Sequence, residues 1–183
     1  MKINKLLLII SLAVGLAVTA CADMDNVLPE SGTLLESQLQ ETNAIAPERA
    51  QAAFSGLFSD IGKPAKMYST PDDWGFLMIN FCNDLEGPDA LIADNNYNWF
   101  SVCGELSSRN ANYRNPYIRY RTPYNMISDA NTFIKSVGET ESQELIYMLA
   151  QARALRAYAY MTLAPAFQFG YQVAGDQPCV PIL

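Results

Sequence analysis

Residues 143–163 read QELIYMLAQARALRAYAYMTL, and this stretch decides the fold of the chain. Its apolar residues recur at intervals of three and four positions, which places them on one face of an α-helix. Thr140 and Gln143 fit a capping box at the start of this helix, and Pro165 predicts its end. The predicted buried stripe consists of Leu145, Met148, Leu149, Ala152, Leu155, Ala159 and Leu163.

The preceding segment predicts a second long helix, from Tyr117 to about Val137, which Gly138 ends. This helix either begins at Pro116 and kinks at Pro123, or consists of two helical pieces that meet there. Because only a few residues join it to the helix that follows, we expect the two to pack as an antiparallel pair. Such a pair, with one helix rich in alanine, resembles a tetratricopeptide-type hairpin. The repeat signature itself is degenerate, so the periodicity alone supports only antiparallel helical pairs.

Two shorter helices are expected nearer the N-terminus. Pro47 opens the first and Gly62 closes it, whereas Thr70 caps the second, Pro71 takes its first position and Gly87 ends it. The expected buried stripes are Ala50, Ala53, Phe54, Leu57, Phe58 and Ile61 in the first helix, and Trp74, Leu77, Met78, Phe81, Cys82 and Leu85 in the second. The sequence therefore predicts an all-α fold built from antiparallel helical pairs.

Residues 87–112 interrupt the helical pattern. Short polar side chains and aromatic side chains alternate there without a helical period. Long ordered loops serve a function more often than they merely connect helices. We therefore expect a long irregular loop that takes part in binding a ligand.

The N-terminus has the three parts of a secretory signal peptide. Lys2 and Lys5 precede an apolar run over residues 6–18, which is shorter than the roughly 20 residues that span a bilayer as a helix. Small residues then lead to Cys21, and Val18-Thr19-Ala20-Cys21 resembles a bacterial lipobox. We therefore predict that Cys21 becomes the first residue of the mature chain and that its acyl chains hold the protein to a membrane.

The sequence accordingly divides into three parts. Residues 1–20 are the predicted signal peptide, residues 21–33 a lipidated tether and residues 34–183 one helical domain. Because Lys2 and Lys5 leave with the signal, 10 of the 12 Lys and Arg residues remain against 19 Asp and Glu residues. So acidic a chain is a poor partner for nucleic acid.

The composition excludes several kinds of catalytic site. The chain has no histidine, which removes Ser-His-Asp and Cys-His catalysis and the usual zinc ligand sets. The spacing of Cys82, Cys103 and Cys179 fits no metal motif. Because three cysteines are an odd number, we expect no disulfide framework. Cys82 is expected in the core. A bridge between Cys103 and Cys179 is possible, but nothing specific supports it. We expect no catalytic residue, no metal and no cofactor.

Several of these features together resemble the SusD/RagB family. Besides the lipobox and the helices, the resemblance rests on Tyr124, Ala130-Asn131, Ile134, Ala152–Tyr160 and Pro178-Cys179-Val180-Pro181. The pattern Ala-x-x-Leu-Arg-Ala-x-x-Tyr within Ala152–Tyr160 is the most specific part. The chain departs from the family pattern over residues 165–170, where many members carry a charged residue, and in the displaced Gly175.

The resemblance implies a function. Members are outer-membrane lipoproteins, exposed at the cell surface, that bind a glycan and deliver it to a TonB-dependent transporter of the SusC type, without enzymatic activity. Their fold combines tetratricopeptide-like helical pairs with an irregular ligand-binding part. Members are longer than this chain, so the chain would correspond to their N-terminal third and would be truncated at Leu183.

A site for such a ligand needs aromatic side chains that stack on the CH faces of sugars and polar groups that reach their hydroxyls. Trp99 and Tyr97 are the candidate stacking platforms, and Asn98 and Asp84 are candidate polar partners. Trp99 could instead anchor the loop to the helices. 

Three other functions stay open at this stage. The chain could bind a peptide, or it could be a fragment without a function of its own. A lipoprotein glycosidase is a further alternative, with Asp84, Asp89 or Glu105 as its carboxylates, although nothing in their spacing favours it.

Overall fold

The computed structural model describes residues 34–59, 61–62, 70–92, 100–168 and 170–183. All regular secondary structure in these residues is helical, which confirms the all-α prediction. The helices are α2 (Glu36–Ile45), α3 (Glu48–Ser59), the 3₁₀ turn η2 (Pro71–Asp73), α4 (Gly75–Glu86), α5 (Ser101–Gly104), α6 (Arg114–Val137), α7 (Gln143–Phe167) and α8 (Tyr171–Ala174).

The chain separates into two units, Met1–Gln38 and Leu39–Leu183. The described part of the first unit, residues 34–38, contains the first turn of α2. There the backbone N–H of Leu35 donates to Oε1 of Gln38 at 2.9 Å, which gives one of the free N–H groups of the helix start a partner.

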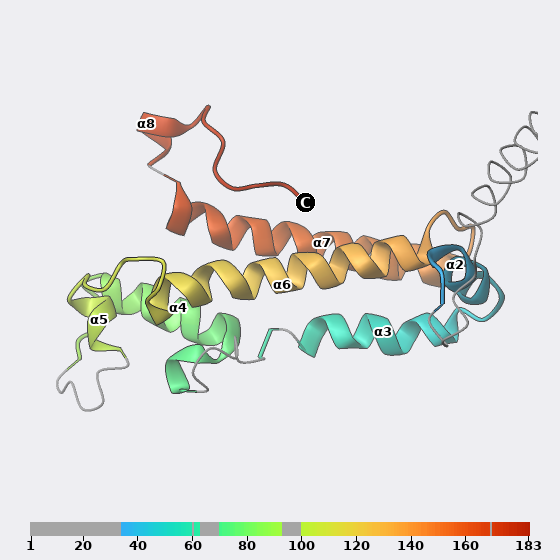
Figure 1. Ribbon diagram of the computed structural model, residues 1–183, viewed down its shortest axis with the longest axis horizontal. Helices are drawn as coiled ribbons and strands as arrows, with labels where there is room; N and C mark the ends of the chain where they lie inside the picture. Colours follow the sequence, from blue (N-terminus) through green and yellow to red (C-terminus); the bar gives the residue numbers. More distant parts are fainter. Residues whose placement is uncertain (1–33, 60, 63–69, 93–99, 169) are drawn as a thin grey trace, which may run out of the picture. The chain divides into compact units, whose positions relative to one another are not determined.

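Helices α6 and α7 form the long hairpin of the second unit (Figure 1). The ring of Tyr120, near the start of α6, lies 5.4 Å from the ring of Phe167 at the end of α7. The ring of Tyr124, one turn further along α6, lies 6.5 Å from the ring of Tyr160, which comes earlier in α7. Contacts in this order require the two helices to run in opposite directions, so the predicted antiparallel pairing is confirmed.

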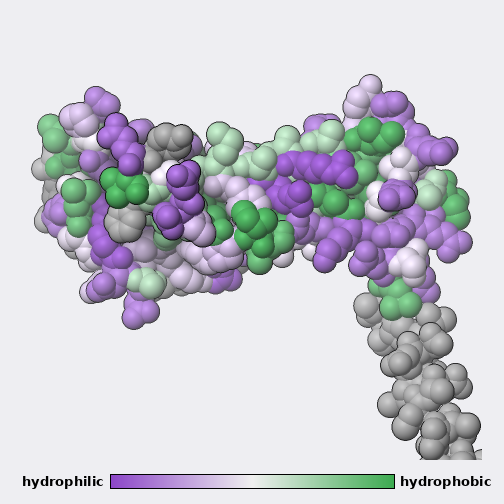
Figure 2. All heavy atoms as spheres, turned by 90° about the horizontal axis from the view of Figure 1, so that it is seen from above, coloured by the Kyte–Doolittle hydropathy of each residue, from purple (hydrophilic) through white to green (hydrophobic). Residues whose placement is uncertain are grey.

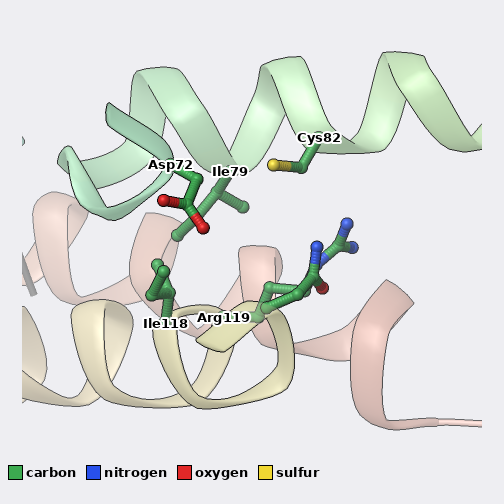
Figure 3. A pocket seen from close by; sticks show the side chains of 6 residues that line it. Asp72, Ile79, Cys82, Ile118 and Arg119 are labelled. Carbon is green, nitrogen blue, oxygen red and sulfur yellow. The ribbon is translucent and has the colours of Figure 1, made fainter. Parts of the chain in front are cut away.

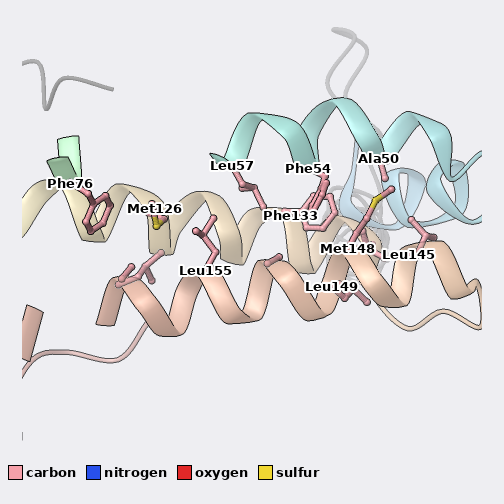
Figure 4. Close-up of a cluster of buried hydrophobic side chains, with 14 of the residues drawn as sticks. Ala50, Phe54, Leu57, Phe76, Met126, Phe133, Leu145, Met148, Leu149 and Leu155 are labelled. Atoms are coloured by element: carbon pink, nitrogen blue, oxygen red, sulfur yellow. The ribbon is translucent and has the colours of Figure 1, made fainter. Parts of the chain in front are cut away.

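The main hydrophobic core lies between α3, α6 and α7 (Figure 4). All seven residues of the predicted α7 stripe are buried, as the periodicity indicated. Phe54 of α3 and Phe133 of α6 meet in this core with ring centroids 5.7 Å apart. Ala152 and Ala159 are fully buried, because their small side chains let α6 pack close against α7.

The prediction for α4 was partly wrong. Trp74, Leu77 and Phe81 were expected in the core, but their exposed fractions are 56%, 70% and 41%. The reason is the helix start. Pro71 opens a 3₁₀ turn rather than the α-helix, and α4 begins afresh at Gly75, whose φ of 63° breaks the register. The buried residues of α4 are Gly75, Phe76, Ile79, Cys82 and Leu85.

Two prolines lie inside helices rather than at their ends. Helix α6 starts at Arg114, before Pro116, and continues through the buried Pro123 to Val137. Helix α7 continues past Pro165, which was predicted to end it, as far as Phe167. Each proline removes one backbone hydrogen bond. Packing along the hairpin maintains both helices despite that loss, because tertiary burial outweighs local preference.

The residues that carry the family resemblance form one contact network. The hydroxyl of Tyr124 donates to the carbonyl oxygen of Pro181 at 2.7 Å, and the backbone N–H of Leu183 donates to the hydroxyl of Tyr160 at 2.8 Å. Arg156 donates to Oδ1 of Asn131 at 2.7 Å, and Nδ2 of Asn131 donates to the carbonyl oxygen of Leu183 at 3.3 Å. The polar residues of the α6 and α7 patterns therefore hold the C-terminal segment against the hairpin.

The surface mixes polar and apolar side chains. On the face that Figure 2 shows, green apolar residues form separate patches among purple polar ones. Among the described helices, none combines the length and the apolar character that a membrane span requires.

Candidate functional site

The structure describes one of the four ligand-binding residues predicted from sequence. Asp84 is exposed in the last turn of α4, and its backbone carbonyl accepts a hydrogen bond from the N–H of Gly87 at 3.2 Å. Tyr97, Asn98 and Trp99 lie outside the described residues, as does Cys21, the predicted lipidation site. The predicted grouping of Asp84 with the three loop residues therefore stays a prediction.

A cluster of charged side chains lies at the end of α4 and the start of α6, where the segment over residues 87–112 connects to the two helices. Oε1 of Glu86, at the end of α4, accepts hydrogen bonds from Arg109 at 3.0 Å and from Arg119 at 2.5 Å. Arg119 also donates to Oδ1 of Asn83 at 2.5 Å. The Arg119 guanidinium on α6 therefore holds the last turn of α4 in place. Glu86 also links Arg119 to Arg109, which lies on the segment between α4 and α6.

This cluster lines a cavity of about 250 Å³. The cavity residues come from the end of α4, the segment before α6, the start of α6 and the end of α7. They are Glu86, Arg109, Asn115, Pro116, Arg119, Pro165, Ala166 and Phe167. The volume is slightly below the roughly 300–1,000 Å³ of sites for drug-sized ligands, so the cavity fits a small ligand or one unit of a larger one.

The cavity combines hydrogen-bonding and apolar walls. Glu86 supplies carboxylate acceptors, and Arg109 and Arg119 supply guanidinium donors. Phe167 is 37% exposed and supplies an aromatic surface, which Tyr120 supports from behind through an edge-on ring contact. Two guanidinium groups and one carboxylate make this place locally positive in a chain with a net charge of −7.

A second, much smaller cavity lies beside the first, between α4 and α6 (Figure 3). It has room for about 10 Å³, and Cys82, Asn115 and Arg119 are among its lining residues. Nε of Arg119 and Oδ1 of Asn115 are buried, and neither has a hydrogen-bond partner among the described residues. Both residues also line the larger cavity, although these two atoms are themselves closed off from solvent.

The turn before α4 is fixed to the same end of α6. Asp72 is 5% exposed, accepts a hydrogen bond from Thr70 at 2.6 Å and forms an ion pair with Arg114 at 3.3 Å. The sequence reading assigned Thr70 as a cap, but the Thr70 side chain does not cap the helix and bonds to Asp72 instead. This ion pair joins η2 to the first turn of α6, next to the cavity residue Asn115.

The sequence did not predict Glu86, Arg109 and Arg119 as site residues. They share no motif in the sequence, and a lone Glu or Arg is usually exposed, whereas Arg119 is only 8% exposed here. A usable signal was present, because Glu86 and Arg109 stand at the two ends of the aromatic and amide-rich segment. Within the described residues, no group of three or more Cys, Asp or Glu residues is arranged to hold a metal ion.

The three comparisons with known proteins are negative: no family model, no curated protein and no solved structure matches this chain.

Proposed function

We propose that this chain is a cell-surface lipoprotein that binds a glycan and delivers it to a TonB-dependent transporter of the SusC type. The observation that carries the proposal is the cavity next to the end of α4 and the start of α6, whose lining includes Glu86, Arg109, Arg119 and Phe167. The resemblance to the SusD/RagB family supports it, because the residues behind that resemblance share one contact network on the hairpin.

The chemistry of the cavity suits a sugar. Glu86 accepts hydrogen bonds from sugar hydroxyls, and Arg109 and Arg119 donate to their oxygens. An aromatic ring such as that of Phe167 packs against the CH face of a pyranose. A sugar carries both hydroxyl groups and an apolar CH face. A cavity that is lined both by charged hydrogen-bonding groups and by an aromatic ring therefore favours a sugar over a purely polar or purely apolar ligand.

The loop residues extend this site in the proposal. Trp99 and Tyr97 are stacking platforms for further sugar units, and Asn98 and Asp84 bind hydroxyls. A cavity of about 250 Å³ holds one unit, so a longer glycan needs platforms beside the cavity. Catalysis is not part of the proposed function, and neither a metal nor a cofactor is required.

The proposed location follows from the N-terminus. Acyl chains on Cys21 anchor the mature chain in the outer membrane, and the tether over residues 21–33 lets the domain stand off the membrane beside its transporter.

Calorimetric titration with a panel of oligosaccharides tests the proposal. Stacking on an aromatic side chain contributes about 1–3 kcal/mol for nucleic-acid bases, so losing one platform should weaken binding by roughly tenfold or more. Trp99→Ala should show this loss, and Trp74→Ala is the matched control. Trp74 is the chain's other tryptophan, is 56% exposed and does not line the cavity.

A second pair of variants tests the cavity itself. Arg109→Gln removes a guanidinium donor from the cavity wall, and Arg153→Gln removes one from the exposed face of α7, outside the cavity. We expect weaker glycan binding only for Arg109→Gln, by roughly tenfold, since hydrogen bonds to charged groups contribute about 1.5–3 kcal/mol. Binding of peptides but not of any glycan would contradict the proposal, and so would equal affinities across all four variants.

A further inference from the structure

Two cysteines lie together beneath the candidate site. Cys82 of α4 is 5% exposed and Cys103 of α5 is 1% exposed, and both belong to one buried cluster with Leu85. Within this cluster the two thiols lie close enough to shift each other's pKa. The sequence reading offered Cys179 as the partner of Cys103, and the structure contradicts it. Sγ of Cys179 instead lies 4.0 Å from the carbonyl oxygen of Ala164 on α7.

We propose that Cys82 and Cys103 form a disulfide bond when the chain folds in an oxidising compartment, which closes residues 83–102 into a covalent loop. Disulfides require the two side chains to face each other at close range, and neighbouring thiols in one packed cluster meet that requirement with little movement of the backbone. Exported proteins meet an oxidising environment, and the N-terminal signal would send this chain there.

In the folded surroundings, Cys103 is favoured as the thiolate of the pair. Nδ2 of Asn115 donates a hydrogen bond to Sγ of Cys103 at 2.7 Å. The hydrogen bond from Cys82 lowers the pKa of the Cys103 thiol, and the positive charge of Arg119 acts in the same direction. The same hydrogen bond, together with burial, raises the pKa of the Cys82 thiol. Cys103 is therefore the better thiolate of the pair.

The reaction is a thiol–disulfide exchange with a disulfide-bearing oxidant, either a small molecule or an oxidoreductase. The Cys103 thiolate attacks one oxidant sulfur, forms a mixed disulfide and releases the first oxidant thiolate. The Cys82 sulfur then attacks Cys103 and releases the second. The two protons of the cysteine thiols end on the two released thiols, so the oxidant gains the two electrons that the protein loses.

The disulfide bond would act as a clamp, that is, a covalent link between the two ends of the segment over residues 83–102. It would join the end of α4 covalently to α5, and Asn115, which contacts Cys103, also lines the larger cavity. Closing a loop of this length restricts mainly the unfolded chain. The oxidised protein should therefore melt roughly 6–12 °C above the reduced protein.

The test is a count of free thiols in the chain that carries Cys21→Ala. The protein is refolded with oxidised glutathione, because both sulfurs are buried, and is then denatured and labelled with a maleimide. We expect one labelled thiol, at Cys179. The chain has no Lys or Arg between Lys66 and Arg109, so a protease that cuts after Asp and Glu is needed to recover the Cys82–Cys103 cross-link by mass spectrometry.

Variants and melting curves complete the test. Cys179→Ser should leave no free thiol after oxidative refolding, and Cys82→Ser should leave two. Three labelled thiols in the Cys21→Ala chain, with a native circular dichroism spectrum, would overturn the proposal, as would a cross-link that contains Cys179. Equal melting temperatures for the oxidised and reduced protein would overturn the role of the bond as a clamp.

Discussion

Gly138 ends α6 in a conformation that favours glycine. Its φ of 66° and ψ of −148° lie in a region that residues with a Cβ rarely adopt. A Cβ built on Gly138 would also lie 2.8 Å from Cδ and 3.0 Å from Nε2 of Gln40. That same Nε2 donates to the carbonyl oxygen of Lys135 at 2.8 Å and so gives a partner to one of the last carbonyls of α6. Gly138→Ala should therefore strain the backbone and displace this hydrogen bond.

The expected loss of stability is the sum of the backbone strain at residue 138 and the lost hydrogen bond from Gln40. A residue held in a sparsely populated backbone region costs about 1–3 kcal/mol. The hydrogen bond from Gln40 contributes about 0.5–1.5 kcal/mol, and it lies near the low end because it is exposed to solvent. Because the Gln40 side chain can rotate away, the steric contact adds little. We expect Gly138→Ala to lower the free energy of unfolding by about 1.5–3.5 kcal/mol.

Urea denaturation followed by circular dichroism measures this cost, and Gly56→Ala is the matched control. Gly56 lies inside α3 with nothing within 4 Å of the Cβ it would gain. There the same change should raise the free energy of unfolding by about 0.5–1 kcal/mol, because alanine favours a helix interior. Two effects of opposite sign from one chemical change, with unchanged m-values, would support the reasoning. A Gly138→Ala effect within about 0.5 kcal/mol of zero, or a loss of similar size in Gly56→Ala, would refute it.

Three further predictions concern the anchor, the C-terminal segment and the core. Cys21→Ala should release the mature chain into the soluble fraction on membrane fractionation, and retention of the variant in membranes would contradict the lipid anchor. Burial raises the pKa of Tyr124 to about 12, which is above its usual value near 10, so the folded state holds this proton more tightly than the unfolded state. The resulting stability is present in full below pH about 10 and is lost as the pH rises towards 12. Urea midpoints measured across that interval should fall less in Tyr124→Phe than in wild type, and equal slopes would count against the assignment. Ala152→Leu should cost about 1–3 kcal/mol by overfilling the contact between α6 and α7, and a variant as stable as wild type would mean that the hairpin is loosely packed there.

The sequence predicted α7 and its pairing with α6 well, because both depend on local patterns. The apolar residues of α7 keep helical spacing over many turns, and only a few residues connect α7 to α6. The apolar face of α7 can therefore be buried in few ways other than against α6. The α4 stripe was misassigned because Gly75 restarts the helix, and no periodicity reveals the φ of a single glycine in advance. Pro165 was misread as a helix end, because the packing that carries α7 past it is a tertiary effect.

The candidate site was harder to predict than the fold. Glu86, Arg109 and Arg119 meet only because α4 packs against the start of α6. Cys103 lies in one cluster with Cys82 and not beside Cys179 for the same reason, since α5 packs against α4 and not against the C-terminal segment. Residue type and spacing along the chain carry no information on such contacts, which arise from the tertiary structure.

The central claim is that the cavity between α4, α6 and α7 binds a sugar. The most direct measurement is a nuclear magnetic resonance titration with the tightest-binding oligosaccharide, following backbone amide signals and arginine Nε–H signals together. We predict shifts centred on Glu86, Arg109 and Phe167, together with a shift of the Nε–H signal of Arg119, because this Nε has no hydrogen-bond partner among the described residues. Shifts confined to α2 and α3, at the other end of the hairpin, with an unchanged Arg119 signal, would contradict it.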